Sequence, residues 1–193
     1  MELEIRKLSP ELTEDYINFF ENIAFTDHPE WSQCYCLHFH WESAWDVESK
    51  NSDWPDKRRE HLLEMIASQK LQGYLAYSSN QVAGWCNTND KANYTGLRRR
   101  NELWDELEEN KKIKSVVCFL VAPKMRGKGI ATQLLEHICQ DAAFDGYEYI
   151  EAYPPKGAFD MYAAHQGTIT LFEKCNFVIH KTFQNDVIMR KHL

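Results

Sequence analysis

The sequence predicts a single domain of the α/β (or α+β) class, and three observations lead to this prediction. The chain has 193 residues, which fits one domain and hardly two, and 44% of them are hydrophobic, so a sizeable packed core can form. Short apolar runs of strand length are interspersed with segments whose apolar residues recur at helical spacing. There is no internal repeat and no low-complexity linker, so we expect one domain over residues 1–193.

These patterns predict the elements in chain order. Alternation around Leu3 and Ile5 predicts a short first strand, and Ser9-Pro10-Glu11 opens a helix. A second helix opens at Trp54-Pro55. The later elements are a hairpin of strands over 73–78 and 82–87, a strand over 115–123 buried on both faces, a helix over 126–144, a strand over 147–152, a short helix over 168–174 closed by Asn176, and a final hairpin over 177–190.

Two segments lack a clean period. Residues 26–53 are rich in Trp, His, Asp and Ser, and they predict a long aromatic loop. Residues 88–113 are largely polar and carry charges of both signs, so we expect an insertion with one amphipathic helix beginning at Glu102. A charge run of this kind usually forms a solvated face.

The charge balance is acidic, with a formal net charge of −7 and a pI near 5.6. This argues against nucleic acid or an anionic membrane as the main partner and suits a cationic, amine-bearing one. No basic start precedes an apolar run, and no apolar stretch approaches the roughly 18 residues that a membrane span needs. We therefore expect a cytoplasmic protein whose six cysteines (34, 36, 86, 118, 139 and 175) are free thiols rather than disulfides.

The strongest motif is VAPKMRGKGIA, residues 121–131. A buried strand ends, two glycines follow, and an amphipathic helix begins at once, so the first amides of the helix can bind an anion. Lys124, Arg126 and Lys128 concentrate positive charge in this loop of an acidic chain. A Walker loop and a dinucleotide fingerprint do not fit, because Gly129-Ile130 follows Lys128 and Thr132 stands where a third glycine is needed. We interpret the motif as a pyrophosphate cradle.

Three segments resemble the GNAT superfamily of acetyl-CoA-dependent N-acetyltransferases. CFLVAPKMRGKGIATQLL is similar to the acyl-CoA motif of that superfamily, YEYIEAYP to the strand that follows it, and GTITLFEKCNF to its closing segment. Their order and spacing also match, over about residues 2–191. Lys124, Phe172 and Asn176 depart from the usual Arg/Gln, Tyr and Gly.

The resemblance implies a mixed sheet in which two central parallel strands splay apart, with acetyl-CoA inserted in the gap. It implies three kinds of cofactor contact. The backbone of Phe119, Leu120 and Val121 would pair with the pantetheine arm, and one amide there would stabilise the oxyanion. His165 falls where many members carry a cofactor-contacting Asn, although a surface His is the alternative. The amides expected at the pyrophosphate belong to Arg126, Gly127, Lys128, Gly129, Ile130 and Ala131.

The resemblance also implies direct attack by a neutral amine, so a base must take a proton. Glu151 is the first candidate, with an edge-facing or ion-paired carboxylate as its alternative; Tyr153 and His165 follow. Many members carry a tyrosine acid where this chain has Phe172, which cannot donate and is expected to pack beside the pantetheine. Tyr153 or Tyr162 could replace that acid, water could serve, or the thiolate could leave with little help.

The acceptor in this superfamily binds between the first helices and the insertion, which here are residues 26–53 and 88–113. Aromatic and acidic residues in both segments fit a cage for a small organic cation, and dense packing of the loop is the alternative. We expect a small-molecule amine acceptor, no metal, and a monomer or homodimer. The expected substrate residues are Tyr35, Cys36, His38, Trp85, Asn87 and Tyr94.

The stretch WSQCYCLHFHW, residues 31–41, holds four possible zinc ligands, Cys34, Cys36, His38 and His40. Neither a strand nor a helix can bring all four within about 2.0–2.3 Å of one ion, so a zinc site needs an irregular loop. We expect these four side chains to share one wall of the acceptor pocket, with Tyr35, Leu37 and Phe39 facing the other way. A zinc-binding protein and a non-catalytic acyl-CoA-binding regulator remain the alternative classes.

Overall fold

The computed structural model describes residues 3–100, 102–105, 108, 110–157 and 164–193. Its centre is one seven-stranded sheet of order β1-β2-β3-β4-β5-β7-β6, in which only β4 and β5 run parallel. The predicted α/β class with a mixed central sheet is confirmed. The strands are β1 (Glu4–Lys7), β2 (Gly73–Ser78), β3 (Gln81–Asp90), β4 (Ile113–Val121), β5 (Tyr149–Ala152), β6 (Val178–Thr182) and β7 (Val187–His192).

Helices cover both faces of this sheet. The α-helices are α1 (Thr13–Asn18), α2 (Trp45–Glu48), α3 (Trp54–Ala67), α4 (Thr95–Arg99), α5 (Ile130–Phe144) and α6 (Ile169–Lys174). Helix α1 continues from a 3₁₀ turn, η1 (Pro10–Leu12), into a π-helical turn, η2 (Phe19–Ile23). The other short turns are η3 (Pro29–Trp31), η4 (His38–His40), η5 (Lys91–Asn93), η7 (Pro123–Met125) and η8 (Ala164–Gln166).

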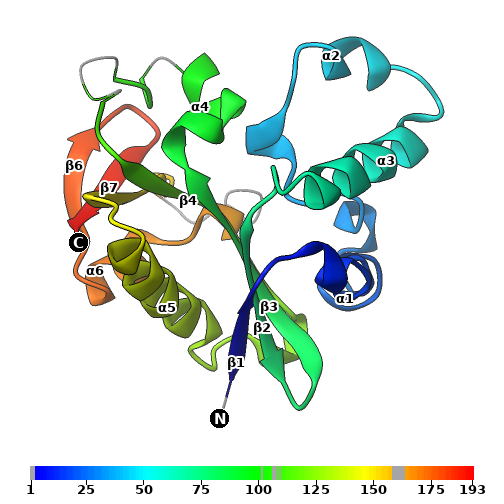
Figure 1. The fold of residues 1–193 in the computed structure, drawn as a ribbon, viewed down its shortest axis with the longest axis horizontal. Helices are drawn as coiled ribbons and strands as arrows, with labels where there is room; N and C mark the ends of the chain where they lie inside the picture. Colours follow the sequence, from blue (N-terminus) through cyan, green and yellow to red (C-terminus); the bar gives the residue numbers. More distant parts are fainter. Residues whose placement is uncertain (1–2, 101, 106–107, 109, 158–163) are drawn as a thin grey trace.

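The two faces of the sheet have separate apolar cores. One core joins α1, the 35–45 segment and α3 to β3 and β4, and it contains the large side chains of Tyr16, Phe20 and Trp85. The other core joins α5 and α6 to the opposite face, through Ile130, Leu134 and other side chains at helical spacing. Figure 1 shows α5 and α6 on one side of the molecule and α1 and α3 on the other.

The parallel strands β4 and β5, at the centre of the sheet, pair over only part of the length of β4. They pair in parallel from Ile113 and Tyr149 to Val116 and Ala152, and β4 then runs on to Val121 while β5 ends. On its other side, the pairing of β4 with β3 shifts register between Asn87 and Thr88, which leaves Val117 as an extra residue. Val117 and Cys118 consequently both lie in the α1 and α3 core, although they are neighbours in the chain.

Two expected helix boundaries were wrong. The insertion forms its helix at Thr95–Arg99, where Tyr94 and Leu97 are buried, whereas residues 102–105 lie in a turn and irregular chain rather than in a helix beginning at Glu102. The helix expected from Arg126 begins at Ile130, because Gly127 and Gly129 have left-handed backbone. Asn176 closes α6 in the left-handed conformation, as predicted, with φ of 65°. None of the described helices has the length and apolar character of a membrane span.

Candidate active site

The loop before α5 has the geometry of an anion-binding site. Gly127 and Gly129 have φ of 75° and 79°, which a side chain disfavours. A Cβ on Gly127 would meet no atom within 4 Å, so the space above it is open. No side chain caps the N-terminus of α5, a helix of 15 residues, and its first amides are therefore available to an anion.

The cations of this loop have different surroundings. Arg126 forms an ion pair with Asp27 of the 26–53 segment, and its Nε donates to the carbonyl of Val121 at 3.2 Å. The hydrogen bond from Arg126 lowers the pKa of Asp27. Lys128 is exposed, with its Nζ 3.5 Å from the sulfur of Met125. Arg126 thus connects the loop to the 26–53 segment.

The residues expected along the pantetheine arm follow the point where β4 and β5 part. Phe119 is buried against Phe172, with ring centroids 6.0 Å apart, and Phe172 also packs on Phe177. Leu120 and Val121 are half-buried at the end of β4. The turn η8, which contains His165, packs against β4. Phe172 is thus an apolar core residue here, and the expected pairing of the β4 backbone with a cofactor stays a prediction.

A buried hydrogen-bond chain lies directly beside the parting point. Tyr153, the residue after β5, donates from its hydroxyl to Glu151 at 3.0 Å and lies 2.7 Å from the Ser115 hydroxyl. Because Tyr153 donates to Glu151, Ser115 donates to Tyr153. Burial raises the pKa of Tyr153 well above its usual value, so its hydroxyl stays protonated. Tyr162, the other candidate acid, lies outside the described residues.

Glu151 is fully buried and its two carboxylate oxygens are engaged by cations. Lys91 donates to one oxygen at 2.8 Å, and Arg190 donates from Nε to the other at 2.8 Å. Arg190 also pairs with Glu108, whose pKa it lowers strongly through its hydrogen bonds. This arrangement matches the ion-paired alternative that the sequence left open, and the role of Glu151 as a base stays a prediction.

One group of side chains among the described residues has the spacing of metal ligands, Glu108, Glu151 and His180, with ligand atoms within 4.8 Å of one another. Arg190 lies between the two carboxylates and donates to both. The guanidinium of Arg190 therefore already supplies the positive charge between the two carboxylates, and we assign no metal site to these three residues.

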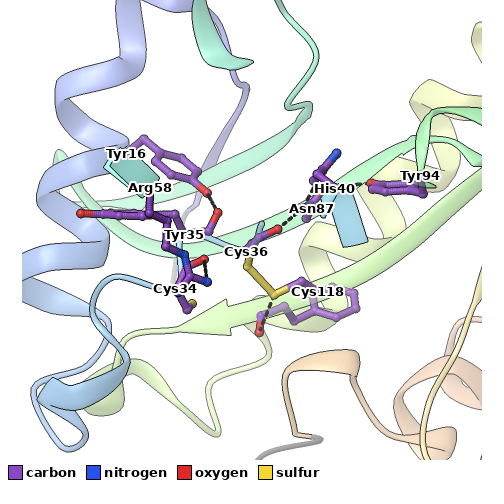
Figure 2. Close-up of a disulfide and its surroundings, with 10 residues drawn as sticks. Tyr16, Cys34, Tyr35, Cys36, His40, Arg58, Asn87, Tyr94 and Cys118 are labelled. Atoms are coloured by element: carbon purple, nitrogen blue, oxygen red, sulfur yellow. Dashed lines mark hydrogen bonds between the residues drawn. A yellow bond between two sulfur atoms is a disulfide. The ribbon is translucent and has the colours of Figure 1, made fainter. Parts of the chain in front are cut away.

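The substrate residues expected on β3 and in the insertion form a second buried network (Figure 2). The amide nitrogen of Asn87 donates to the carbonyl of Cys36 at 3.0 Å and to Nε2 of His40 at 3.3 Å. Its amide oxygen accepts from the hydroxyl of Tyr94 at 2.8 Å. Burial lowers the pKa of His40 to about 4, so the ring is neutral near pH 7. Trp85 is fully buried beside Tyr16.

The structure joins Cys36 to Cys118 in a disulfide, which Figure 2 shows between the 26–53 segment and β4. The prediction of six free thiols was therefore wrong for these two residues. The signal that sequence reasoning lacked was proximity, because the two cysteines are 82 positions apart. Among the described residues, the free thiols are Cys34, Cys86, Cys139 and Cys175.

The predicted alternation of the 31–41 stretch was also wrong. This stretch forms turns, in which Tyr35 and Cys36 have left-handed backbone with φ of 45° and 50°. Cys36 and His40 are buried together with Tyr35, Leu37 and Phe39, whereas His38 is exposed. The four possible zinc ligands thus share no wall, and Cys36 has its sulfur in the disulfide.

The remaining aromatic residues of the 26–53 segment pack on one another. The ring centroids of Trp41, Trp45 and Trp54 are 5.4–6.1 Å apart. The ring of Trp45 also stacks on that of His61, with 4.7 Å between the centroids. Of the carboxylates expected in a cage, Asp27 pairs with Arg126, and Asp46 accepts from the indole of Trp41. These contacts favour packing as the role of the aromatic residues there.

Sequence reasoning missed three residues that contact Glu151 or Tyr153 in the buried network, Ser115, Lys91 and Arg190. Lys91 and Arg190 lie in polar or strand-end sequence with no motif around them, and only the fold brings both to Glu151. Ser115 carries a weak signal: it is a hydroxyl inside an apolar strand, directly opposite Glu151 in the parallel pair.

Parted parallel strands next to a glycine loop at a helix N-terminus define a protein of the acyltransferase class. The comparison with protein families makes this specific. The model of the acetyltransferase (GNAT) family matches residues 11–177, so the chain belongs to that family.

Solved structures share the fold at low identity. The PaiA N-acetyltransferase from Thermoplasma acidophilum, solved in complex with coenzyme A, is 17% identical with a TM-score of 0.56 and covers 100% of each chain. A polyamine N-acetyltransferase from Drosophila melanogaster that forms N-acetylagmatine is 13% identical with a TM-score of 0.55, again over 100% of each chain. A putative GNAT-family acetyltransferase from Desulfovibrio desulfuricans is 15% identical with a TM-score of 0.59 over 99% of each chain. No curated protein matches the sequence.

Proposed function

We propose that this protein transfers the acetyl group of acetyl-CoA to a primary amine of a small, cationic acceptor, in a ternary complex and in the cytoplasm. The observation that carries the proposal is the open glycine loop at the N-terminus of α5, placed at the end of a strand that has parted from its parallel neighbour. Family membership supports acetyl transfer as the reaction, and a related fold in complex with coenzyme A supports the donor.

The residues present fit the donor. The amides of residues 126–131 and the exposed side chain of Lys128 would hold the pyrophosphate, because the space above Gly127 and Gly129 admits a close approach. On its β5 side, the β4 backbone beyond Val116 pairs with no strand among the described residues. The backbone groups of Phe119 to Val121 that point away from β3 would therefore pair with the pantetheine arm, apart from the Val121 carbonyl, which accepts from Arg126.

The proton of the attacking amine leaves through the buried hydrogen-bond chain. Ser115 and Tyr153 lie at the parting point, and Glu151 lies one hydrogen bond further in. In this path Glu151 is the final proton acceptor, and Tyr153 connects it to the reacting atoms. Lys91 and Arg190 position the carboxylate through their hydrogen bonds. The hydrogen bonds and the protonated state of Tyr153 support this path.

The thiolate of coenzyme A leaves without a proton from residue 172. Phe172 has no donor group and is fully buried among Phe119 and Phe177. The ordinary pKa of a thiol, about 8.5, makes the thiolate a tolerable leaving group near neutral pH.

A cationic acceptor is supported by charge and by relatives. The chain carries a net charge of −7, which favours encounter with cations. A related fold from Drosophila melanogaster is a polyamine N-acetyltransferase that forms N-acetylagmatine. We therefore place diamines, polyamines and guanidino amines first among the acceptors.

The test is release of coenzyme A from acetyl-CoA in the presence of an amine panel of polyamines, agmatine, amino sugars and peptide N-termini. We expect release well above the rate without amine for at least one cationic member, with the acetylated amine identified by mass. Thermal stabilisation by acetyl-CoA with no release for any amine would point instead to a non-catalytic acyl-CoA-binding protein. No stabilisation and no release would contradict the donor assignment as well.

A further inference from the structure

The Cys36–Cys118 disulfide connects two parts of the site that the chain supplies from distant positions. Cys36 belongs to the 26–53 segment, and Cys118 lies on β4, 82 positions later. Their Cα atoms are 6.7 Å apart, within the range that a disulfide spans without moving the backbone. The fold therefore places the two cysteines where a disulfide can form.

Cys118 lies beside the point at which β4 parts from β5. It follows Val117, the extra residue of the bulge, and it is paired with Asn87 of β3. Val117, Cys118 and Tyr153 are 1%, 6% and 1% exposed. They share their apolar cluster with Tyr35, Cys36 and other side chains of the 35–39 turn. That turn therefore covers the face of β4 on which Tyr153 lies, while α5 covers the opposite face.

The covering turn has an unfavourable backbone that its contacts hold in place. Tyr35 and Cys36 both have positive φ, which costs a non-glycine residue free energy at each position. Buried side chains hold the carbonyls of this turn: Tyr16 donates to Tyr35 at 2.9 Å, and Asn87 donates to Cys36 at 3.0 Å. Arg58 donates to the carbonyl of Cys34 at 3.0 Å. The disulfide adds the one covalent bond to these hydrogen bonds.

We propose that Cys36 and Cys118 form a redox-modification site that controls access of the acceptor amine to the acetyl group. The proposal rests on the proposed function, because it takes the parting point as the place of transfer. In the oxidised form the 35–39 turn is bonded to β4 and covers that place. In the reduced form only hydrogen bonds and apolar contacts hold a strained turn, so it moves aside for the amine.

The chemistry is a two-electron exchange with a small-molecule disulfide such as oxidised glutathione. The thiolate of one cysteine attacks a sulfur of the small disulfide and releases one thiol, which leaves a mixed disulfide. The thiolate of the other cysteine then attacks the protein sulfur of that mixed disulfide and releases the second thiol. The two protein thiols lose two electrons and two protons, and the small disulfide gains both. A small dithiol such as dithiothreitol reverses the exchange.

The experiment compares the full chain equilibrated with oxidised glutathione and with dithiothreitol, as wild type and as Cys36→Ser, Cys118→Ser and Cys34→Ser. Thiols are counted by alkylation under denaturing conditions. Steady-state rates are measured with the best amine of the panel. Hydrogen exchange of residues 34–40 reports on the turn without reference to activity. The Cys34→Ser variant is the matched control, because Cys34 is a free thiol two positions away.

The proposal predicts four alkylated thiols in the oxidised wild type and six in the reduced one, since two of six cysteines form the disulfide. Reduction should raise kcat/KM for the amine at least about 10-fold, speed exchange in 34–40, and lower Tm by about 5–15 °C. Cys34→Ser should respond in the same way, whereas Cys36→Ser and Cys118→Ser should give equal rates in both buffers.

Three results would overturn the proposal. They are six reactive thiols in the oxidised wild type, equal amine kinetics in the two redox states, and a redox response that survives in Cys36→Ser or Cys118→Ser. If no amine is acetylated in either state, the proposed function fails first. The exchange of 34–40 then decides the redox site alone, and equal exchange in both states would exclude it.

Discussion

The two sides of the candidate site are built in different ways. The proposed cofactor side consists of residues 121–131, a continuous stretch in which strand, glycine loop and helix follow one another. The proposed acceptor side is assembled from Cys36, Asn87, Tyr94 and Cys118, which only the fold brings together. The first side depends on backbone conformation at two glycines, and the second depends on buried side-chain contacts over long sequence distances.

This difference has an energetic consequence. A local loop makes few long-range contacts, so changes there should act mainly on cofactor affinity and cost the fold only about 1–2 kcal/mol. Buried polar and charged networks are costly when one member is lost, because the partner is left unsatisfied away from water. The comparison therefore predicts larger effects in the buried networks, which include Glu151, Tyr153 and Arg190, than in the glycine loop.

The largest effect is expected from the hydrogen-bond chain under the parting point. Glu151→Gln and Tyr153→Phe should each lower kcat/KM for the best amine by ~10²–10⁴-fold, because each interrupts the proposed proton path. Steady-state kinetics over a pH range provide the measurement, with acetyl-CoA affinity as the control for folding of the cofactor side. A rate for Glu151→Gln within about threefold of wild type would exclude Glu151 as the proton acceptor.

The next largest effect concerns the stability of the buried ion-pair network around Glu151. Arg190→Met leaves the buried Glu151 and the mostly buried Glu108 without their shared guanidinium, so we expect a loss of about 3–5 kcal/mol in the free energy of unfolding. Denaturant unfolding measures it. Arg6→Met, which removes the exposed pair with Glu4, is the matched control and should change little. Equal losses of unfolding free energy in the two variants would mean that the buried network stabilises the fold no more than an exposed ion pair does.

The buried imidazole of His40 makes acceptor-side stability depend on pH. Its folded pKa of about 4 lies below the usual value of 6.5, so between these values the unfolded chain binds more protons. Stability should consequently fall by about 3 kcal/mol as pH drops from 6.5 to 4, and this contribution should be complete above pH 6.5.

Unfolding free energies of wild type and His40→Phe across this range test that dependence. The slope against pH should be shallower in the variant, whatever its stability at pH 7. His192→Phe, at an exposed position, should keep the slope of the wild type. Parallel curves for wild type and His40→Phe would refute the assignment.

A smaller effect is expected on the cofactor side. Gly129→Ala places a side chain at φ of 79°, which costs about 1–2 kcal/mol and should weaken acetyl-CoA binding by about 10-fold. Gly146, at the other end of α5, has φ of 73°. Gly146→Ala should therefore lower stability by a similar amount and leave cofactor affinity unchanged. Titration calorimetry separates the two, and an unchanged affinity in Gly129→Ala would argue against the loop as the pyrophosphate site.

The smallest kinetic effect is expected at Phe172. The ring of Phe172 packs tightly against Gly167, because a Cβ on that glycine would lie only 3.0 Å from it. Phe172→Tyr adds a hydroxyl to this ring, and we assign no proton-donor role to the position. The acidic limb of the pH–rate profile should stay nearly unchanged, although Tm should fall because the hydroxyl is buried. A large gain in rate would instead mean that the site lacks an acid that Tyr can supply.

The sequence was sufficient where structure is local. The strands over 73–78 and 115–123, the glycine loop before α5 and the closing residue Asn176 all follow from residue-level rules, and the structure places them close to the expected positions. The helix in the insertion was misplaced, because burial of Tyr94 and Leu97 is decided by contacts with the 26–53 segment.

The acceptor side could not be predicted in the same way. The 31–41 stretch was read by its alternation of residue types, but two consecutive left-handed residues, Tyr35 and Cys36, break any period of two. The partners of Glu151, Lys91 and Arg190, lie 60 and 39 positions away. Such pairings depend on the topology of the fold, and no regular spacing in the sequence predicts them.

The Cys36–Cys118 bond also changes the connectivity of the molecule. Together with the chain between its two ends, it closes a covalent ring that contains α2, α3, β2, β3 and α4. A protease that cuts once inside this ring, for example in the exposed stretch 51–53, opens it without separating the molecule into two pieces. The two products should therefore migrate together until a thiol is added, and gel electrophoresis of a nicked sample would reveal whether the ring was closed.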